Sequence, residues 1–153
     1  MKKESEREAD LIEAASLMRI EQKVDKKANE FEKIMLIYKS ALKVLRTKFD
    51  ILNEEFNSFC EYNPIDHITE RMKSPDSIIE KMQRKELELN YKNLIEQVND
   101  IAGMRIICSF KDDVFKLVKI IENFHEVEIL ERKDYITNPK PSGYSSYHMI
   151  VEV

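Results

Sequence analysis

The chain has 153 residues, of which 35% are charged and 42% are apolar, and its formal net charge is −4. This length favours one domain with a real hydrophobic core, and the acidic balance argues against a generic nucleic-acid coat protein. No apolar run approaches the roughly 18 residues of a membrane span, and the charged N-terminus lacks the apolar core of a signal peptide. The composition therefore predicts a soluble cytoplasmic protein with no membrane partner.

Residues 4–29 are dense in Glu, Lys and Ala and carry only a thin apolar stripe, which includes Leu11, Ala15 and Met18. They predict an exposed helix, or two, packing weakly on something else. A solvated helical extension is the simpler interpretation, and a partner-binding or oligomer-forming helix is the alternative. We assign residues 1–30 to this extension and residues 31–153 to the domain that carries function.

Stronger helical periodicity begins in the next stretch, at Phe31, Ile34, Met35, Tyr38, Leu42, Leu45, Phe49, Leu52 and Phe56. It predicts a long amphipathic helix that ends before Asn63-Pro64 and covers one face of a sheet. The aromatic residues of this stripe are interpreted as core. Residues 61–73 show no clear period and are predicted to be irregular.

A second helix is predicted to begin at Ser74-Pro75-Asp76, because Ser is a good cap, Pro suits the first helical position and an acid suits the first turn. Cations lie before and along it, at Arg71, Lys73, Lys81, Arg84 and Lys85. A helix N-terminus with cations on both sides is suited to an anion. Nearby glutamates favour a salt-bridged surface helix instead, and from this segment alone that interpretation is preferred.

The remaining segments alternate between helical and strand patterns. They predict a short helix over residues 86–97, a buried strand from Ile101 to Phe110, an amphipathic helix from Asp112 to Phe124, and strands over Val127–Leu130 and Tyr147–Val153. This order predicts an α+β fold (α/β-like) with a mixed sheet flanked by helices.

The two glycines of the chain lie in two informative stretches. Gly143 belongs to the segment from Lys133 to His148, which is predicted to be a long exposed loop carrying function. Gly103 follows Asp100, and it is predicted to mark a bulge. Glycine is expected where the backbone takes positive φ or approaches a ligand. We therefore predict that the two stretches form the halves of one site.

Several side chains in these stretches suit nucleotide chemistry. A carboxylate at a strand end, such as Asp100, can hold Mg²⁺, although alone it is more often a cap or an ion-pair partner. Tyr144 offers a flat face for a base, with strand packing as the alternative for it and for Tyr147. The loop adds two cations suited to phosphate and two hydrogen-bonding groups: Lys133, Lys140, Ser142 and His148. The combination indicates a nucleotide site.

Other chemistries find no support in the sequence. It contains neither a Gly-x-x-x-x-Gly-Lys-Ser/Thr loop nor a Gly-x-Gly-x-x-Gly motif. The histidines His67, His125 and His148 are scattered, and Cys60 and Cys108 are far apart, so neither a histidine or cysteine metal site nor a nucleophile–base pair is indicated. Both thiols are expected to be reduced and structural.

Three motifs in order resemble the synthetase domain of the RelA/SpoT family, and more closely the small alarmone synthetases, which are bacterial GTP pyrophosphokinases. They are Arg71-x-Lys73-Ser74-Pro75-x-Ser77-Ile78, Asp100-Ile101-Ala102-Gly103-x-Arg105-Ile106, and Asp134-Tyr135-Ile136…Lys140-x-Ser142-Gly143-Tyr144-x-Ser146-Tyr147-His148. The resemblance implies a nucleotidyltransferase-like fold. It also implies transfer of pyrophosphate from ATP to the ribose 3′-hydroxyl of GDP or GTP with Mg²⁺, which makes (p)ppGpp in the stringent response.

The same resemblance implies residue roles. Asp100 becomes the catalytic carboxylate and Mg²⁺ ligand. The ATP-binding set is Arg71, Lys73, Ser74, Lys81, Arg84 and Arg105, with the two arginines stacking on the adenine. The GDP/GTP-binding set is Lys133, Lys140, Ser142, Tyr144 and His148, with Tyr144 stacking on the guanine. The family's general base is a glutamate in a later strand, expected beyond Val153, so the chain resembles a synthetase incomplete at its C-terminal end.

Partners follow from the resemblance as well. Relatives are homo-oligomers, often tetramers, and some bind single-stranded RNA, so both are expectations here. Two alternatives stay open. One is a non-catalytic fragment that binds nucleotide or RNA or mediates oligomerisation, and the other is a helical interaction protein built on residues 4–56.

Overall fold

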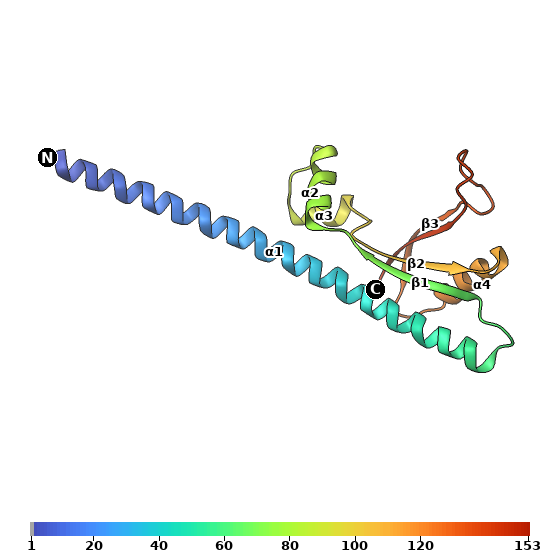
Figure 1. Ribbon diagram of the computed structural model, residues 1–153. Coiled ribbons are helices and arrows are strands. Elements are labelled where there is room, and N and C mark those ends of the chain that lie inside the picture. The colour runs from blue at the N-terminus through green and yellow to red at the C-terminus, as the bar shows by residue number, and fades with distance from the viewer. Residues whose placement is uncertain (1) are drawn as a thin grey trace. The chain divides into compact units, whose positions relative to one another are not determined.

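The computed structural model describes the backbone of residues 2–153 and the side chains of residues 11–153. In chain order its elements are α1 (Lys2–Phe59), β1 (Ile65–Met72), α2 (Pro75–Arg84), α3 (Tyr91–Gln97), β2 (Ala102–Cys108), α4 (Lys111–Glu122), β3 (Glu128–Asp134) and β4 (Tyr147–Glu152) (Figure 1). The chain divides into two units, Met1–Ile37 and Tyr38–Val153.

The first unit consists of the N-terminal part of α1. The one or two helices predicted over residues 4–29 belong to a single continuous helix, because neither proline nor glycine occurs between Lys2 and Phe59. Side chains from Leu11 to Glu30 are all exposed, as expected of an extension. No helix of the described residues is long and apolar enough to cross a membrane.

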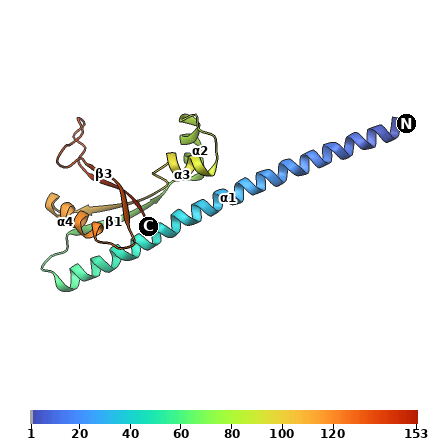
Figure 2. The same ribbon diagram turned by 180° about the vertical axis from the view of Figure 1, so that it is seen from behind.

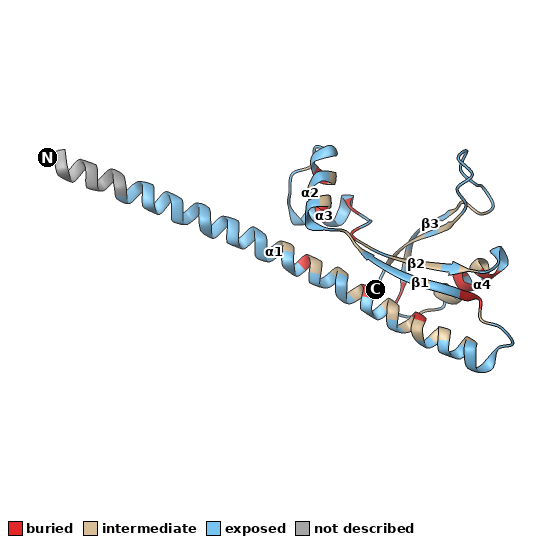
Figure 3. Cartoon of the chain, in the orientation of Figure 1, coloured by how far each residue is buried: buried red, intermediate tan, exposed pale blue. Residues whose placement is uncertain are grey.

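In the second unit, the rest of α1 carries the remaining part of the predicted stripe, of which Tyr38, Leu45, Leu52 and Phe56 are half-buried. Leu42 and Phe49 are buried, whereas Lys39, Lys43 and Glu54 are exposed. Figure 3 shows α1 with a few buried positions among mostly exposed ones. The Phe49 ring meets Phe124 edge-on at 5.8 Å, and Lys48 Nζ lies 2.7 Å from a Glu126 carboxylate oxygen. Arg46 Nη1 donates to the Ile68 carbonyl at 3.5 Å, which joins α1 to β1.

The α+β class is confirmed, but the strands do not form the single mixed sheet that was predicted. The four described strands form two antiparallel pairs, β1 with β2 and β3 with β4 (Figures 1 and 2). Strand β1 lies in the segment predicted to be irregular. Its exposed residues are mostly polar and only Ile65 is fully buried, so a search for apolar alternation misses it.

The boundaries of α3 and β3 also differ from the predicted ones. Helix α3 begins at Tyr91 rather than at residue 86, after Asn90, whose side chain accepts from Asn93 N. Strand β3 continues to Asp134, because the antiparallel ladder with β4 extends beyond the apolar residues into exposed, charged ones. The predicted functional loop is therefore shorter than Lys133 to His148, since both of those residues lie in the β3–β4 ladder.

Two groups of buried side chains hold the second unit together. The first fixes α2, α3 and the segment before β2: Ile78, Met82, Leu94, Val98 and Ile101, each at most 2% exposed. The second includes Ile65, Leu117, Val118 and Val127 with Leu42 and Phe49 of α1. Helix α4 packs against β2, and its Phe115 meets Tyr147 of β4 edge-on at 6.1 Å. The strand ends are thereby fixed in place.

Candidate functional site

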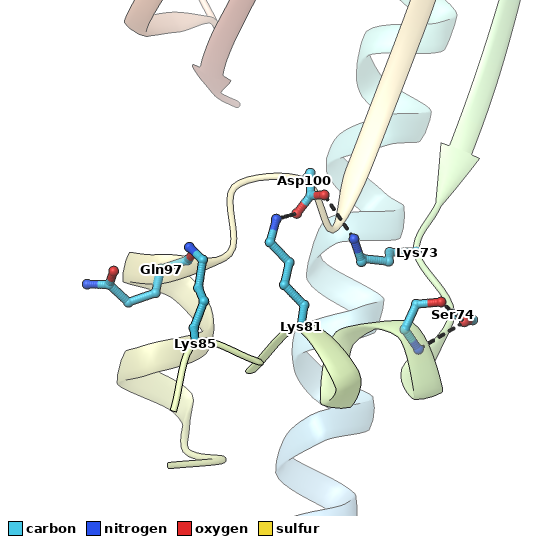
Figure 4. Close-up of polar contacts among 7 residues, drawn as sticks. Lys73, Ser74, Lys81, Lys85, Gln97 and Asp100 are labelled. Carbon is cyan, nitrogen blue, oxygen red and sulfur yellow. Dashed lines mark hydrogen bonds and ion pairs between the residues drawn. The ribbon is translucent and has the colours of Figure 1, made fainter. Parts of the chain in front are cut away.

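Asp100 receives an ion pair on each of its carboxylate oxygens. Lys73 Nζ lies 2.9 Å from Oδ2, and Lys81 Nζ lies 2.5 Å from Oδ1 (Figure 4). Lys73 directly follows β1, Lys81 belongs to α2, and Asp100 lies just before β2. The sequence predicted these three residues for one nucleotide site, and the structure brings them together.

Local structure explains the arrangement. Ser74 caps α2 by accepting from Ser77 N, with Pro75 at the first helical position, as predicted. Ile78 and Met82 turn the apolar face of α2 inward. Lys85 Nζ donates to the Gln97 carbonyl at 2.8 Å, which ties α2 to α3 (Figure 4). Arg84 is exposed in the last turn of α2, one turn after Lys81.

The charge of Asp100 reflects opposing effects. Partial burial raises the pKa of its carboxyl group, whereas hydrogen bonds and positive charge from Lys81 and Lys73 lower it, and the net pKa is about 2. The Asp100 side chain is 54% exposed, while the lysines are 14% and 21% exposed. A negative carboxylate open to solvent, paired with the ammonium groups of two lysines, is suited to exchange with a phosphate and a hard cation.

An exposed face of the β1–β2 pair lies beyond this cluster. Arg71 pairs with Gly103 and Thr69 pairs with Arg105, so Arg71 and Arg105 are diagonal neighbours on one face. Both arginines and Gly103 are exposed. A side chain added at Gly103 would meet nothing within 4 Å, so the space opposite Arg71 is open.

One prediction about this strand was wrong. Gly103 marks no bulge, because the register is regular from Met72↔Ala102 to Ile68↔Ile106 and the irregularity lies between Ile65 and His67. Gly103 does not take positive φ, which leaves close approach to a ligand as the reason expected for this glycine; among the described residues only Gly143 and Glu86 take positive φ.

The second candidate region is the loop cluster, which we define as Tyr135, Lys140, Tyr144 and His148. The Tyr144 hydroxyl and His148 Nε2 are 2.8 Å apart, and their rings meet edge-on at 5.8 Å. Lys140 Nζ lies 4.7 Å from the ring centroid of Tyr135 and 5.6 Å from that of Tyr144. Cation and aromatic rings are thus gathered at the tip of the β3–β4 hairpin.

Backbone hydrogen bonds shape this loop. Gly143 N donates to the Lys140 carbonyl at 2.8 Å, and Lys140 N donates to the Tyr144 carbonyl at 3.1 Å. Gly143 has φ of 82°, as predicted for a glycine in a loop that needs the left-handed region. The turn holds Lys140 and Tyr144 opposite each other.

The other predicted loop residues fall in different places. Lys133 pairs with His148 across the ladder, and Lys133 Nζ also lies 3.1 Å from Glu131 Oε1. Ser142 is exposed in the turn. Tyr147 contacts Phe115 instead, so it is the tyrosine that packs. Sequence reasoning missed Tyr135, because only the hairpin register brings it next to Tyr144 and His148.

The two regions do not touch. Among the residues that the structure describes, no ion pair, hydrogen bond or ring contact joins the Asp100 cluster to the loop cluster. Figure 1 shows the hairpin tip and helices α2 and α3 at different ends of the β1–β2 pair. The prediction that they form one site is thus not met by direct contact.

Comparison with known proteins decides the family. The profile described as "Region found in RelA / SpoT proteins" matches residues 70–153, which include every predicted site residue. The chain belongs to the RelA/SpoT family. Within it, the chain is 44% identical over 119 residues to "GTP pyrophosphokinase YwaC" of Bacillus subtilis, a match that covers 78% of this chain and 57% of that protein.

Solved structures of the RelA/SpoT family share the fold. Small alarmone synthetase 2 from Bacillus subtilis matches with a TM-score of 0.69 and 42% identity, covering 80% of this chain and 61% of the other. Small alarmone synthetase 1 from the same organism, "bound to its product pppGpp", matches with a TM-score of 0.70 and 33% identity, covering 80% and 61%. The chain thus spans less than two thirds of the length of these relatives.

Proposed function

We propose that this chain is the nucleotide-binding part of a (p)ppGpp synthetase, which transfers pyrophosphate from ATP to the ribose 3′-hydroxyl of GDP or GTP. The observation that carries the proposal is the pairing of Asp100 with Lys73 and Lys81 beside an open arginine-bearing strand face, in a chain of the RelA/SpoT family. Relatives named as GTP pyrophosphokinase support the reaction.

ATP is proposed to bind across α2 and the exposed face of β1 and β2. Diagonal neighbours on a sheet face lie roughly 7–8 Å apart, which is about twice the contact distance of stacked planes. Arg71 and Arg105 therefore have the separation to hold an adenine between their guanidinium groups, over the open position at Gly103. Lys73, Ser74, Lys81 and Arg84 are in place for the phosphates at the N-terminal end and along one side of α2.

Asp100 is the proposed magnesium ligand. Mg²⁺ is usually held by one or two carboxylates together with substrate phosphates. The half-exposed carboxylate of Asp100 fits that pattern. When bound, the ion would neutralise charge on the phosphates. On nucleotide binding, Lys73 and Lys81 are proposed to exchange their ion pairs with Asp100 for ion pairs with phosphate oxygens.

The acceptor nucleotide is proposed to bind at the hairpin tip. Tyr144, 42% exposed, offers its ring to the guanine. Lys140 and His148 contact Tyr144, Lys133 pairs with His148 across the ladder, and Ser142 is exposed in the same loop. These four residues are proposed to supply cations and hydrogen-bonding groups to the nucleotide. Catalysis of this kind rests on positioning and charge neutralisation.

The proposal is tested by label transfer from ATP to GDP or GTP in the presence of Mg²⁺, with the products separated by anion exchange. If the chain turns over, Asp100→Asn is expected to reduce product at least about 100-fold. Asp66→Asn serves as the matched control, because Asp66 is an exposed carboxylate at the far end of β1.

Binding of fluorescent ATP and GDP analogues separates the remaining outcomes. Binding of both nucleotides without product identifies the non-catalytic alternative, a nucleotide-binding fragment of the synthetase. A folded chain that binds neither nucleotide would overturn the proposal. Assembly into homo-oligomers and binding of single-stranded RNA belong to the same proposal and are checked by light scattering and by RNA titration.

A further inference from the structure

Tyr135 occupies the middle of the loop cluster. Its ring meets His148 edge-on at 5.5 Å and Tyr144 at 6.4 Å, and Lys140 Nζ lies 4.7 Å from its centroid. The ring of Tyr135 therefore contacts all three other members. Neither the predicted nucleotide sets nor the mechanism above assigns it a role.

The backbone around Tyr135 is firmly held. Tyr135 N donates to the Ser146 carbonyl at 2.8 Å, which continues the β3–β4 pairing by one step. The Asp134 carboxylate accepts from Ile136 N and Thr137 N, both at 2.9 Å, and from Thr137 Oγ1 at 2.6 Å. Tyr135 is thus half-buried on the stem of the hairpin, whereas Lys140 and Tyr144 lie exposed on the loop.

Because Tyr135 is held more firmly than Lys140 and Tyr144, its ring can restrict the conformations of these two side chains, which are proposed to bind the ligand. A lysine has a long flexible stem, and ordering such a side chain on binding weakens affinity. Lys140 Nζ lies closer to the Tyr135 ring than to the Tyr144 ring, so the fixed ring orders it before any ligand arrives. The edge of the same ring limits how Tyr144 and His148 turn.

We propose that Tyr135 is a positioning residue for the acceptor nucleotide. It holds the Lys140 ammonium and the Tyr144 ring in the arrangement that a guanine nucleotide meets, without itself touching the reacting atoms. This inference rests on the proposed function of the loop cluster and adds the residue that pre-organises it.

The test compares dissociation constants of a fluorescent GDP analogue and a fluorescent ATP analogue for the full chain. Tyr135→Leu is expected to weaken GDP binding about tenfold and leave ATP binding unchanged, because it removes an aromatic and a cation contact from the loop cluster alone. Tyr135→Phe keeps the ring and is expected to bind GDP like the unmodified chain. Tyr147→Leu is the control for a structural role, since Tyr147 packs on Phe115, outside the loop cluster.

Two further measurements show whether Tyr135 acts through its neighbours. Added to Tyr144→Leu, the Tyr135→Leu change is expected to weaken GDP binding far less than it does alone, because the shared partner is already lost. The ring signals of His148 in nucleotide-free protein are expected to shift on Tyr135→Leu and to stay in place on Tyr135→Phe.

Clear results would overturn the proposal. A Tyr135→Leu variant that binds GDP as tightly as the unmodified chain contradicts the proposal. A variant that binds both GDP and ATP more weakly to the same extent, and that also melts at a lower temperature, contradicts it as well, because that is the pattern of a structural residue. An unmodified chain that binds ATP but not GDP would instead overturn the proposed acceptor site, and the inference with it.

Discussion

Asp100 illustrates how single residues prepare the site. Its ion pairs with Lys73 and Lys81 fix two cations at one carboxylate, yet the Asp100 side chain is 54% exposed. Solvent screens such pairs, so they contribute at most about 1 kcal/mol to folding. Their consequence is for binding: the positive charges are already gathered where phosphates are proposed to lie.

The pH dependence of these pairs follows from the lowered pKa of Asp100. The carboxyl has a pKa of about 2 in the folded chain against 3.8 unperturbed, so the contribution to stability is present above about pH 4 and is lost as the pH falls toward 2. Urea unfolding of the chain and of Asp100→Asn is expected to differ by at most about 1 kcal/mol at pH 7 and by less near pH 2.5.

Carboxyl NMR titration gives the direct measurement for Asp100, with a midpoint near 2 expected. A midpoint at 4 or above would show that the lysines do not hold the carboxylate in solution. Asp66→Asn is the stability control, because no ion pair is formed by Asp66 among the described contacts.

Among the elements, helix α2 has an N-terminal end that the sequence predicts and a C-terminal end that it does not predict. The N-terminal end carries Ser74 and Pro75, both readable in advance. The C-terminal end closes with Leu87 N on the Met82 carbonyl and Glu86 N on the Gln83 carbonyl, each at 2.9 Å. This is the Schellman pattern, which usually has glycine at the residue with positive φ. Here Glu86 occupies it, with φ of 56°.

Glu86→Gly is therefore expected to stabilise the chain by about 0.5–1 kcal/mol, because glycine adopts positive φ without the strain that a Cβ introduces. Thermal or urea unfolding checks the change. Glu88→Gly is the matched control. Glu88 is also an exposed glutamate, two residues further along the chain, but its φ is not positive, so the added backbone freedom of glycine is expected to destabilise the folded chain. Destabilisation by Glu86→Gly would contradict the assignment of strain.

At the scale of the whole molecule, every proposed nucleotide-binding residue lies in the second unit, Tyr38–Val153. The first unit carries exposed apolar side chains at Leu11, Leu17, Met18, Ile20 and Val24. The nucleotide chemistry raised by the sequence thus maps to the second unit, whereas the helical interaction protein, built on residues 4–56, draws on both units.

A chain starting at Tyr38 is expected to bind the ATP and GDP analogues as the full chain does, because both clusters and every buried apolar residue except Ile34 lie within it. Fluorescence titration measures this, with Tyr144→Leu in both lengths as the control for specific GDP binding. A folded shorter chain that lost nucleotide affinity would assign part of the site to residues 1–37.

The sequence by itself determined the α+β class, the amphipathic stripe of α1, the cap of α2, the positive φ at Gly143 and the set of candidate side chains. These are local: each depends on periodicity, cap chemistry or the steric freedom of a residue type. The family resemblance, read from three ordered motifs, was confirmed by the match over residues 70–153.

Only the tertiary structure decided which residues meet. Strand β1 pairs with β2 although few of its residues are apolar, and that register makes Arg71 a neighbour of Arg105 across Gly103. The β3–β4 ladder likewise places Tyr135 against Tyr144 and His148. Register is set by pairing between segments distant in sequence, and no pattern within either segment contains it.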